Sequence, residues 1–84
     1  MLYLAHLDGH DLDVAVPGPW SQLRRLRPGL LLVASDASRS AVYHALKDEL
    51  PAGCPLLVAR LHEVPKFRGM ADGSLAWARR QDLG

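Results

Sequence analysis

Cysteine is nearly absent from this sequence, because Cys54 is the only one in 84 residues. One cysteine cannot form an intramolecular disulfide, which excludes a disulfide-stabilised secreted domain. Long apolar runs are also missing, since Leu30–Ala34 is typical of those present and a membrane-spanning helix needs about 20 apolar residues. Residues 1–7 lack the basic start and long apolar stretch of a signal peptide. We therefore expect a cytoplasmic protein without membrane contact.

A strong excess of either charge is absent too. Ten Lys and Arg residues face nine Asp and Glu residues, which gives a net charge of +1 and a pI of about 8.0. Dedicated nucleic-acid-binding domains are more basic than this, so a nucleic-acid contact would require a local basic patch.

The length and apolar content predict one folded domain over residues 1–84. Hydrophobic residues make up 49% of the chain, which is too many for an intrinsically disordered protein. A chain of this size buries a limited core and has a thin margin of stability. Self-association would enlarge the buried surface, so we expect a homodimer.

Near the N-terminus, apolar residues alternate in residues 3–7 and again in residues 12–16. Asp8-Gly9 lies between them, and an Asp-Gly pair between alternating segments is a strong hairpin signal. We therefore predict an N-terminal β-hairpin whose apolar side chains share one buried face.

Helical and strand-like patterns alternate along the rest of the chain. The expected elements are a short helix from Pro19 or Trp20 to Arg27, a buried strand over Leu30–Ala34, a helix from Asp36 or Ser38 to Leu50, a second buried strand over residues 56–59 that can extend to His62, and a helix from Ser74 to Gln81. Residues 65–73 have the composition of a loop. The predicted class is α+β, a β-hairpin followed by α-β-α-β and a short C-terminal helix.

Residues 33–61 carry a resemblance to a known group of proteins. The pattern consists of Val33-Ala34-Ser35-Asp36-Ala37-Ser38, then Val42, Leu46-Lys47 and Leu50, and finally Leu56-Leu57-Val58. It resembles the second half of small bacterial ferredoxin-fold proteins related to the CRISPR-associated small nuclease-like subunit and to VapD-type toxins. The resemblance implies a two-layer ferredoxin-like sandwich that forms dimers. In the nuclease-like members an acidic residue at the end of the first strand is associated with metal, which implies Asp8 as the candidate catalytic residue.

The polar face of the expected hairpin offers a candidate metal site. His6 would lie opposite Asp11 or Asp13 in either turn register, at the separation of cross-strand neighbours. An imidazole and two carboxylates can bind a divalent ion, and His10 or Asp8 could add a ligand. The alternative is an ordinary surface pair of histidine and aspartate. No other cofactor is indicated.

Basic residues recur in three places and form a candidate nucleic-acid surface. They are Arg24, Arg25, Arg27, Lys66, Arg68, Arg79 and Arg80. Arginine has the bidentate geometry that phosphate prefers, and Trp20, Phe67 or Trp77 could stack on bases. The alternatives are a solvated helix face for the charges and core positions for the aromatic rings.

These observations favour a homodimeric ferredoxin-like module that binds a macromolecular partner such as RNA or DNA. Two alternatives stay open at this point. One is a metal-dependent ribonuclease that uses Asp8 or the group of His6, Asp11 and Asp13. The other is a toxin–antitoxin component that acts through protein contacts.

Overall fold

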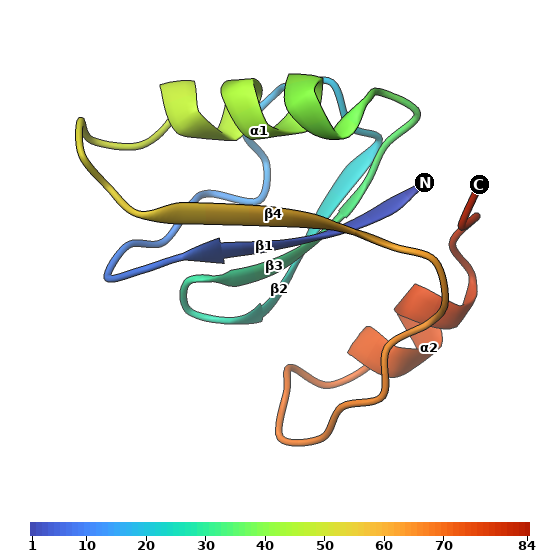
Figure 1. Ribbon diagram of the computed structural model, residues 1–84. Helices are drawn as coiled ribbons and strands as arrows, with labels where there is room; N and C mark the ends of the chain where they lie inside the picture. Colours follow the sequence, from blue (N-terminus) through green and yellow to red (C-terminus); the bar gives the residue numbers. More distant parts are fainter.

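The protein, described over residues 1–84 by a computed structural model, contains one four-stranded antiparallel sheet and two helices (Figure 1). In chain order the elements are β1 (Leu2–Leu7), β2 (Gln22–Arg27), β3 (Leu30–Ala34), α1 (Arg39–Asp48), β4 (Leu56–Leu61) and α2 (Ser74–Arg79). The predicted α+β class is confirmed. Neither helix has the length and apolar character needed to cross a membrane.

The strands lie in the order β2-β3-β1-β4. Strand β1 pairs antiparallel with both β3 and β4, so β3 and β4 run parallel to each other with β1 between them. Helix α1 makes the connection from β3 to β4 and therefore crosses over the end of β1 (Figure 1). The two predicted strands on either side of this helix are thus parallel, but they are not neighbours.

One face of the sheet, here called the α1 face, packs against α1. Ser38 caps the helix, since its Oγ accepts a hydrogen bond from the Ala41 N–H at 3.1 Å. Val42 and Leu46, one turn apart, are fully buried against the sheet. The cap and the spacing of these residues were both visible in the sequence, and the predicted helix is confirmed with Ser38 rather than Asp36 as its cap.

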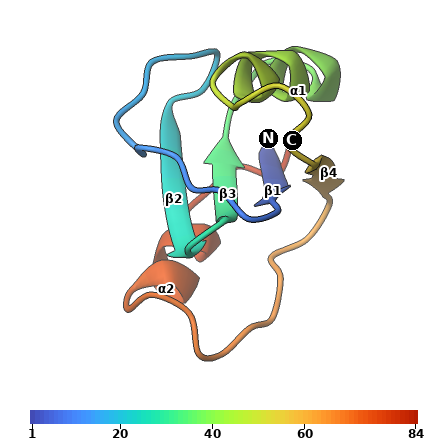
Figure 2. The same ribbon diagram turned by 90° about the vertical axis from the view of Figure 1, so that its left-hand side faces the viewer.

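The opposite face, here called the α2 face, is covered by α2 and the preceding loop (Figures 1 and 2). Trp77 and Ala78 of α2 pack there against Leu2, Leu26 and Leu32. The Trp77 Nε1–H donates to Gln22 Oε1 at 2.8 Å, which satisfies the polar atom of a buried ring. Helices therefore pack on both faces of the sheet, in contrast to the two layers expected. The α2 face is covered only in part, since the paired residues His6 and Leu57 stay exposed.

The predicted N-terminal hairpin is wrong. Residues 12–16 form no strand, because β3 and β4 occupy both edges of β1. This segment instead passes over the α1 face, where Leu12 is buried and Val16 and Trp20 pack beside it. Figure 2 shows the blue segment between β1 and β2 beside α1.

The predicted helix ending at Arg27 is also wrong, since residues 22–27 form strand β2. Leu23 and Leu26 are three residues apart, a spacing that fits one face of a helix. In a strand this odd separation places them on opposite faces, and each is buried in a different cluster. Pro28 and Gly29 then form the tight turn to β3, with Gly29 at a φ of 79°.

Strand β4 is confirmed in its position along the chain, but the prediction that it is buried is wrong. It was expected to be buried, yet it is an edge strand with β1 as its only neighbour, and Leu57 is 55% exposed. Strand β3, by contrast, is central and buried as predicted, with β2 on one side and β1 on the other.

Candidate nucleic-acid interface

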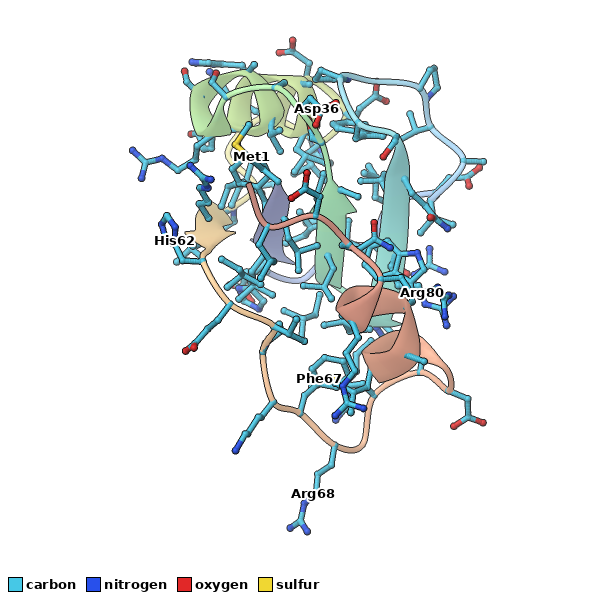
Figure 3. All side chains as sticks on the ribbon, turned by 90° about the vertical axis from the view of Figure 1, so that its right-hand side faces the viewer. Met1, Asp36, His62, Phe67, Arg68 and Arg80 are labelled. Atoms are coloured by element: carbon cyan, nitrogen blue, oxygen red, sulfur yellow. The ribbon has the colours of Figure 1, made fainter.

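The loop before α2 and the outer side of that helix form a basic hollow of about 330 Å³. Its lining consists of Val64, Pro65, Lys66, Phe67, Leu75 and Arg79. The floor is apolar, two cations lie at its rim, and no carboxylate lines it. Arg68 is exposed next to Phe67 in the loop, and Figure 3 shows its side chain projecting away from the body of the protein.

We call Lys66, Phe67, Arg68 and Arg79 the α2 basic patch. Its two parts come from different elements, the loop and the helix, and are brought together because α2 is anchored on the sheet through Trp77 and Ala78. Arg80 is exposed at the C-cap of α2, and Figure 3 shows it away from Arg68. It extends the positive charge of this end of the molecule without lining the hollow.

The arginines of β2 do not join this patch. Arg24 lies on the α2 face, where its Nε donates to Ser74 Oγ at 3.3 Å and its Nη2 to the Asp72 carbonyl at 2.7 Å. It therefore attaches the start of α2 to β2. Arg27 is exposed at the end of the strand, and its side chain makes no hydrogen bond or ion pair.

Arg25 lies on the α1 face and holds the segment between β1 and β2. Its Nε contacts both carboxylate oxygens of Asp11 at 3.1 Å, and its Nη2 donates to the Leu12 carbonyl at 2.6 Å. Burial raises the pKa of Asp11, but hydrogen bonds from two backbone N–H groups and from Arg25 favour the ionised carboxylate. The net result is a pKa below its usual range.

Of the three aromatic residues considered as base-stacking groups, only Phe67 lies at the patch. Trp77 is buried in the core. Trp20 packs against the α1-face cluster, and its Nε1–H donates to the Val16 carbonyl at 3.0 Å. Phe67 is partly buried and lines the basic hollow.

The predicted metal ligands are brought together only in part, because His6 and Asp11 line one hollow and Asp13 does not. Without the hairpin, His6 is exposed on β1 between Leu30 and Leu57 of the neighbouring strands. Asp11 is paired with Arg25, and Asp13 Oδ1 accepts from the Ala15 N–H at 2.9 Å. The chain contains no group of three or more His, Cys, Asp or Glu side chains arranged to hold a metal ion.

Asp8, the candidate catalytic residue, is exposed just beyond the end of β1. It lines an open polar hollow of about 450 Å³ together with His6, His10 and Asp11. Among these groups Asp11 is held by Arg25 as described, which leaves Asp8 as the free carboxylate of the hollow. The place of Asp8 at the end of the first strand is as the sequence indicated.

No protein-family model, curated protein or solved structure matches this chain. The geometry of its side chains therefore carries the functional argument.

Sequence reasoning missed a second basic group, formed by Arg39, Arg60 and His62. These residues line a hollow between the start of α1 and the end of β4. Arg39 and Arg60 are far apart in the sequence. Only the crossover that places α1 beside β4 brings them together, and the local sequence carries no signal for it.

Proposed function

We propose that the protein is a ferredoxin-like module that binds single-stranded nucleic acid through the α2 basic patch. The observation that carries the proposal is the hollow in which Lys66 and Arg79 flank Phe67 above an apolar floor. A single-strand binding surface combines cations that follow the phosphate backbone with an aromatic ring on which a base can stack. The partly buried ring of Phe67 is the candidate for stacking in this hollow.

The strand order supports the ferredoxin-like part of the proposal. From the other edge, the sheet reads β4-β1-β3-β2, and α1 connects the parallel pair β3 and β4 across β1, which is a split βαβ unit. Strands β1 and β2 are related in the same way across β3. Their connection has no helix, but residues 12–20 pack beside α1 on the same face.

The distribution of charge supports the choice of ligand. With a net charge of +1 the whole protein offers little long-range attraction, so binding must depend on a local set of cations. In the patch, Lys66, Arg68 and Arg79 have no carboxylate partner within ion-pair distance, since the only ion pairs in the protein join Met1 to Asp36 and Arg25 to Asp11. These three cations are free to contact phosphate.

The first test measures binding of a fluorescent single-stranded oligonucleotide over a range of salt concentrations. Lys66→Gln with Arg79→Gln should weaken binding and reduce the slope of log K against log salt by about 0.7 for each lost phosphate contact. Phe67→Ala should weaken binding by roughly 5-fold to 100-fold through loss of stacking, with little change in slope.

Lys47→Gln is the matched control, because Lys47 is an exposed cation on α1, on the opposite face of the sheet. It should leave the salt slope unchanged. Equal binding by the parent and the double variant would reject the α2 basic patch as the interface. Cleavage of RNA in magnesium or manganese, lost in Asp8→Asn, would favour the ribonuclease alternative.

We also propose that the protein forms a homodimer through the free edge of β4. This strand has one neighbour, so its outer backbone N–H and C=O groups are open to a second strand. Leu57 is the most exposed large apolar side chain in the protein and lies on this strand. Pairing of two β4 edges would bury it and continue the sheet across the dimer.

A further inference from the structure

A hollow of about 580 Å³ lies where the start of α1 meets the end of β4. Its lining residues are Met1, Tyr3, Ser38, Arg39, Ser40, Arg60 and His62. Three basic residues and three residues with a hydroxyl group therefore line one space, and no Asp or Glu lines it. Figure 3 shows His62 at the end of β4, on the side of α1 and away from Phe67 and Arg68. The hollow is thus separate from the α2 basic patch.

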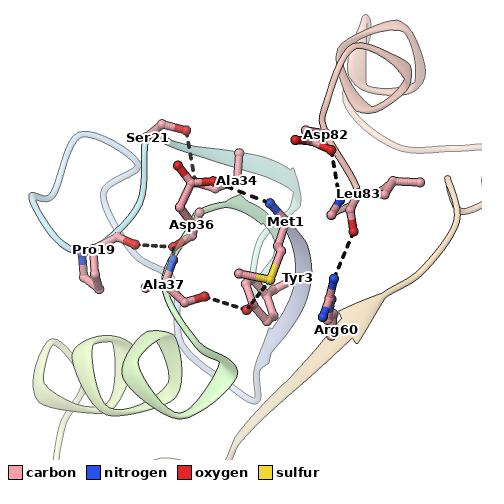
Figure 4. A network of polar contacts seen from close by, with 12 residues as sticks. Met1, Tyr3, Pro19, Ser21, Ala34, Asp36, Ala37, Arg60, Asp82 and Leu83 are labelled. Carbon is pink, nitrogen blue, oxygen red and sulfur yellow. Dashed lines mark hydrogen bonds and ion pairs between the residues drawn. The ribbon is translucent and has the colours of Figure 1, made fainter.

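Arg60 is the fixed member of this group. Its Nη2 donates to the Leu83 carbonyl at 3.2 Å, which holds the guanidinium against the C-terminal segment (Figure 4). Its Nε is buried and has no hydrogen-bond partner. Buried donors are normally paired, so the chain does not use the full hydrogen-bonding capacity of this guanidinium.

The walls of the hollow are held in place by neighbouring contacts. The Tyr3 hydroxyl donates to the Ala37 carbonyl at 2.6 Å, which joins β1 to the turn before α1 (Figure 4). Ser38 fixes the first turn of α1 through its bond from the Ala41 N–H. Arg39 and Ser40 follow directly, so their positions relative to Arg60 are set by the packing of α1 on the sheet.

The acidic residues next to the lining in the sequence do not neutralise the group. Asp36 precedes α1, but its side chain is fully exposed and lies 4.0 Å from the Met1 amino group. Glu63 follows His62 and is exposed outside the lining of the hollow. Arg39 and Arg60 form no ion pair with either of them. Their charges are therefore available to a ligand.

We propose that this hollow binds a phosphate group, either as inorganic phosphate or as the phosphate of a monoester such as a nucleotide. Guanidinium groups form charge-assisted, bidentate hydrogen bonds to phosphate oxygens, and the guanidinium groups of Arg39 and Arg60 both line this hollow. The free N–H groups in the first turn of α1 add a favourable dipole at the same place. This site does not depend on the proposed nucleic-acid binding.

The test is a titration of the isotope-labelled full chain, followed by NMR at constant ionic strength in chloride. Inorganic phosphate and a nucleoside 5′-monophosphate are the two probes, each taken to about 10 mM, which would saturate a millimolar site. We expect shifts of the Arg60 Nε–H and of the Arg39 and Ser40 amides. Tighter binding of the monophosphate would assign the site to a nucleotide, and equal binding to the phosphate group alone.

Arg39→Gln and His62→Gln change exposed residues and should each weaken binding by roughly 3-fold to 10-fold, the range for loss of one hydrogen bond. Arg27→Gln removes the same charge at the opposite edge of the sheet and should leave binding unchanged. Equal weakening by Arg27→Gln, or no saturable shift with either probe, would overturn the proposal.

The same variants distinguish a failure of the phosphate-site proposal from a failure of the nucleic-acid proposal. Arg39→Gln should leave oligonucleotide binding within about 2-fold of the parent, because Arg39 lies outside the α2 basic patch. The variant carrying Lys66→Gln and Arg79→Gln should keep the phosphate-induced shift of Arg60 Nε–H. A variant that abolished both kinds of binding would show that the two hollows are not separate sites.

Discussion

Two adjacent arginines show how strongly the role of a residue depends on its face of the sheet. Arg24 and Arg25 carry the same charge and lie next to each other in β2. Strand alternation sends Arg24 to the α2 face, where it binds Ser74 and Asp72, and Arg25 to the α1 face, where it binds Asp11. Both guanidinium groups are used inside the fold, so neither is a free phosphate-binding group.

The contact between Asp11 and Arg25 gives a prediction about pH. The pKa of Asp11 is lowered in the folded protein from its ordinary value of 3.8, so its ionised form stabilises the fold above that value and this contribution is lost as pH falls through the lowered pKa. Asp11→Asn should therefore be less stable than the parent at neutral pH. The difference should be below about 1 kcal/mol, because the pair is partly exposed.

Urea denaturation at neutral pH and again below the folded pKa of Asp11 checks this prediction. The gap between the parent and Asp11→Asn should close at the lower pH, where the parent carboxyl group is protonated. Asp13→Asn is the control, since the Asp13 carboxylate caps only a local exposed turn. A gap of the same size at both values of pH would show that charge on Asp11 is not what stabilises the segment.

At the scale of elements, the sequence predicted those whose signals are local. Helix α1 has a cap at Ser38 and buried residues at helical spacing, and β3 is a short apolar run between two turns. The failures involve partners distant in sequence. Residues 12–16 alternate like a strand, but β1 is already paired with β3 and β4. Leu23 and Leu26 have a helical spacing, but the two clusters that bury them lie on opposite faces of the sheet.

For the candidate sites too, the sequence predicted what is local and missed what depends on contacts between distant segments. The chemical character of Lys66, Arg68 and Arg79 was visible in the sequence, but their convergence with Phe67 depends on the docking of α2. The group of His6, Asp11 and Asp13 was predicted only through the hairpin, and it is not assembled without it.

Helix α1 gives a prediction about stability. Leu46 is fully buried between the helix and the sheet, so Leu46→Ala should lower the free energy of unfolding by about 2 to 5 kcal/mol. Val14→Ala truncates an apolar side chain that is 38% exposed and lies away from β4, and it should cost much less. Chemical denaturation of both variants and the parent measures the difference. Coincident midpoints for Leu46→Ala and the parent would mean that this face of α1 contributes little to the core.

At the scale of the whole molecule, the main question is what stabilises so short a chain. Its core is divided by the sheet into two clusters, one under α1 and one under α2. Neither helix is long, and α2 has six residues, fewer than an isolated helix needs to be stable in water. Arg24 and Trp77 attach α2 to β2 by hydrogen bonds. A chain of this size is expected to have a small free energy of unfolding, so self-association that buries more apolar surface is favourable.

The edge of β4 is where that association should occur. Exposed strand edges pair readily with other strands, and natural proteins prevent this by placing charges on them. Leu57 instead presents an apolar side chain there, so the parent should sediment as two chains at micromolar concentration. Leu57→Lys should shift the mass towards one chain, because pairing of two β4 edges would bring two like charges together in the interface.

Val14→Lys is the control for this prediction. It introduces lysine at an exposed apolar residue of the segment between β1 and β2, away from β4, and the variant should remain dimeric. A parent mass of one chain that does not change with concentration would rule out the homodimer, whereas a dimer unaffected by Leu57→Lys would place the interface elsewhere on the molecule.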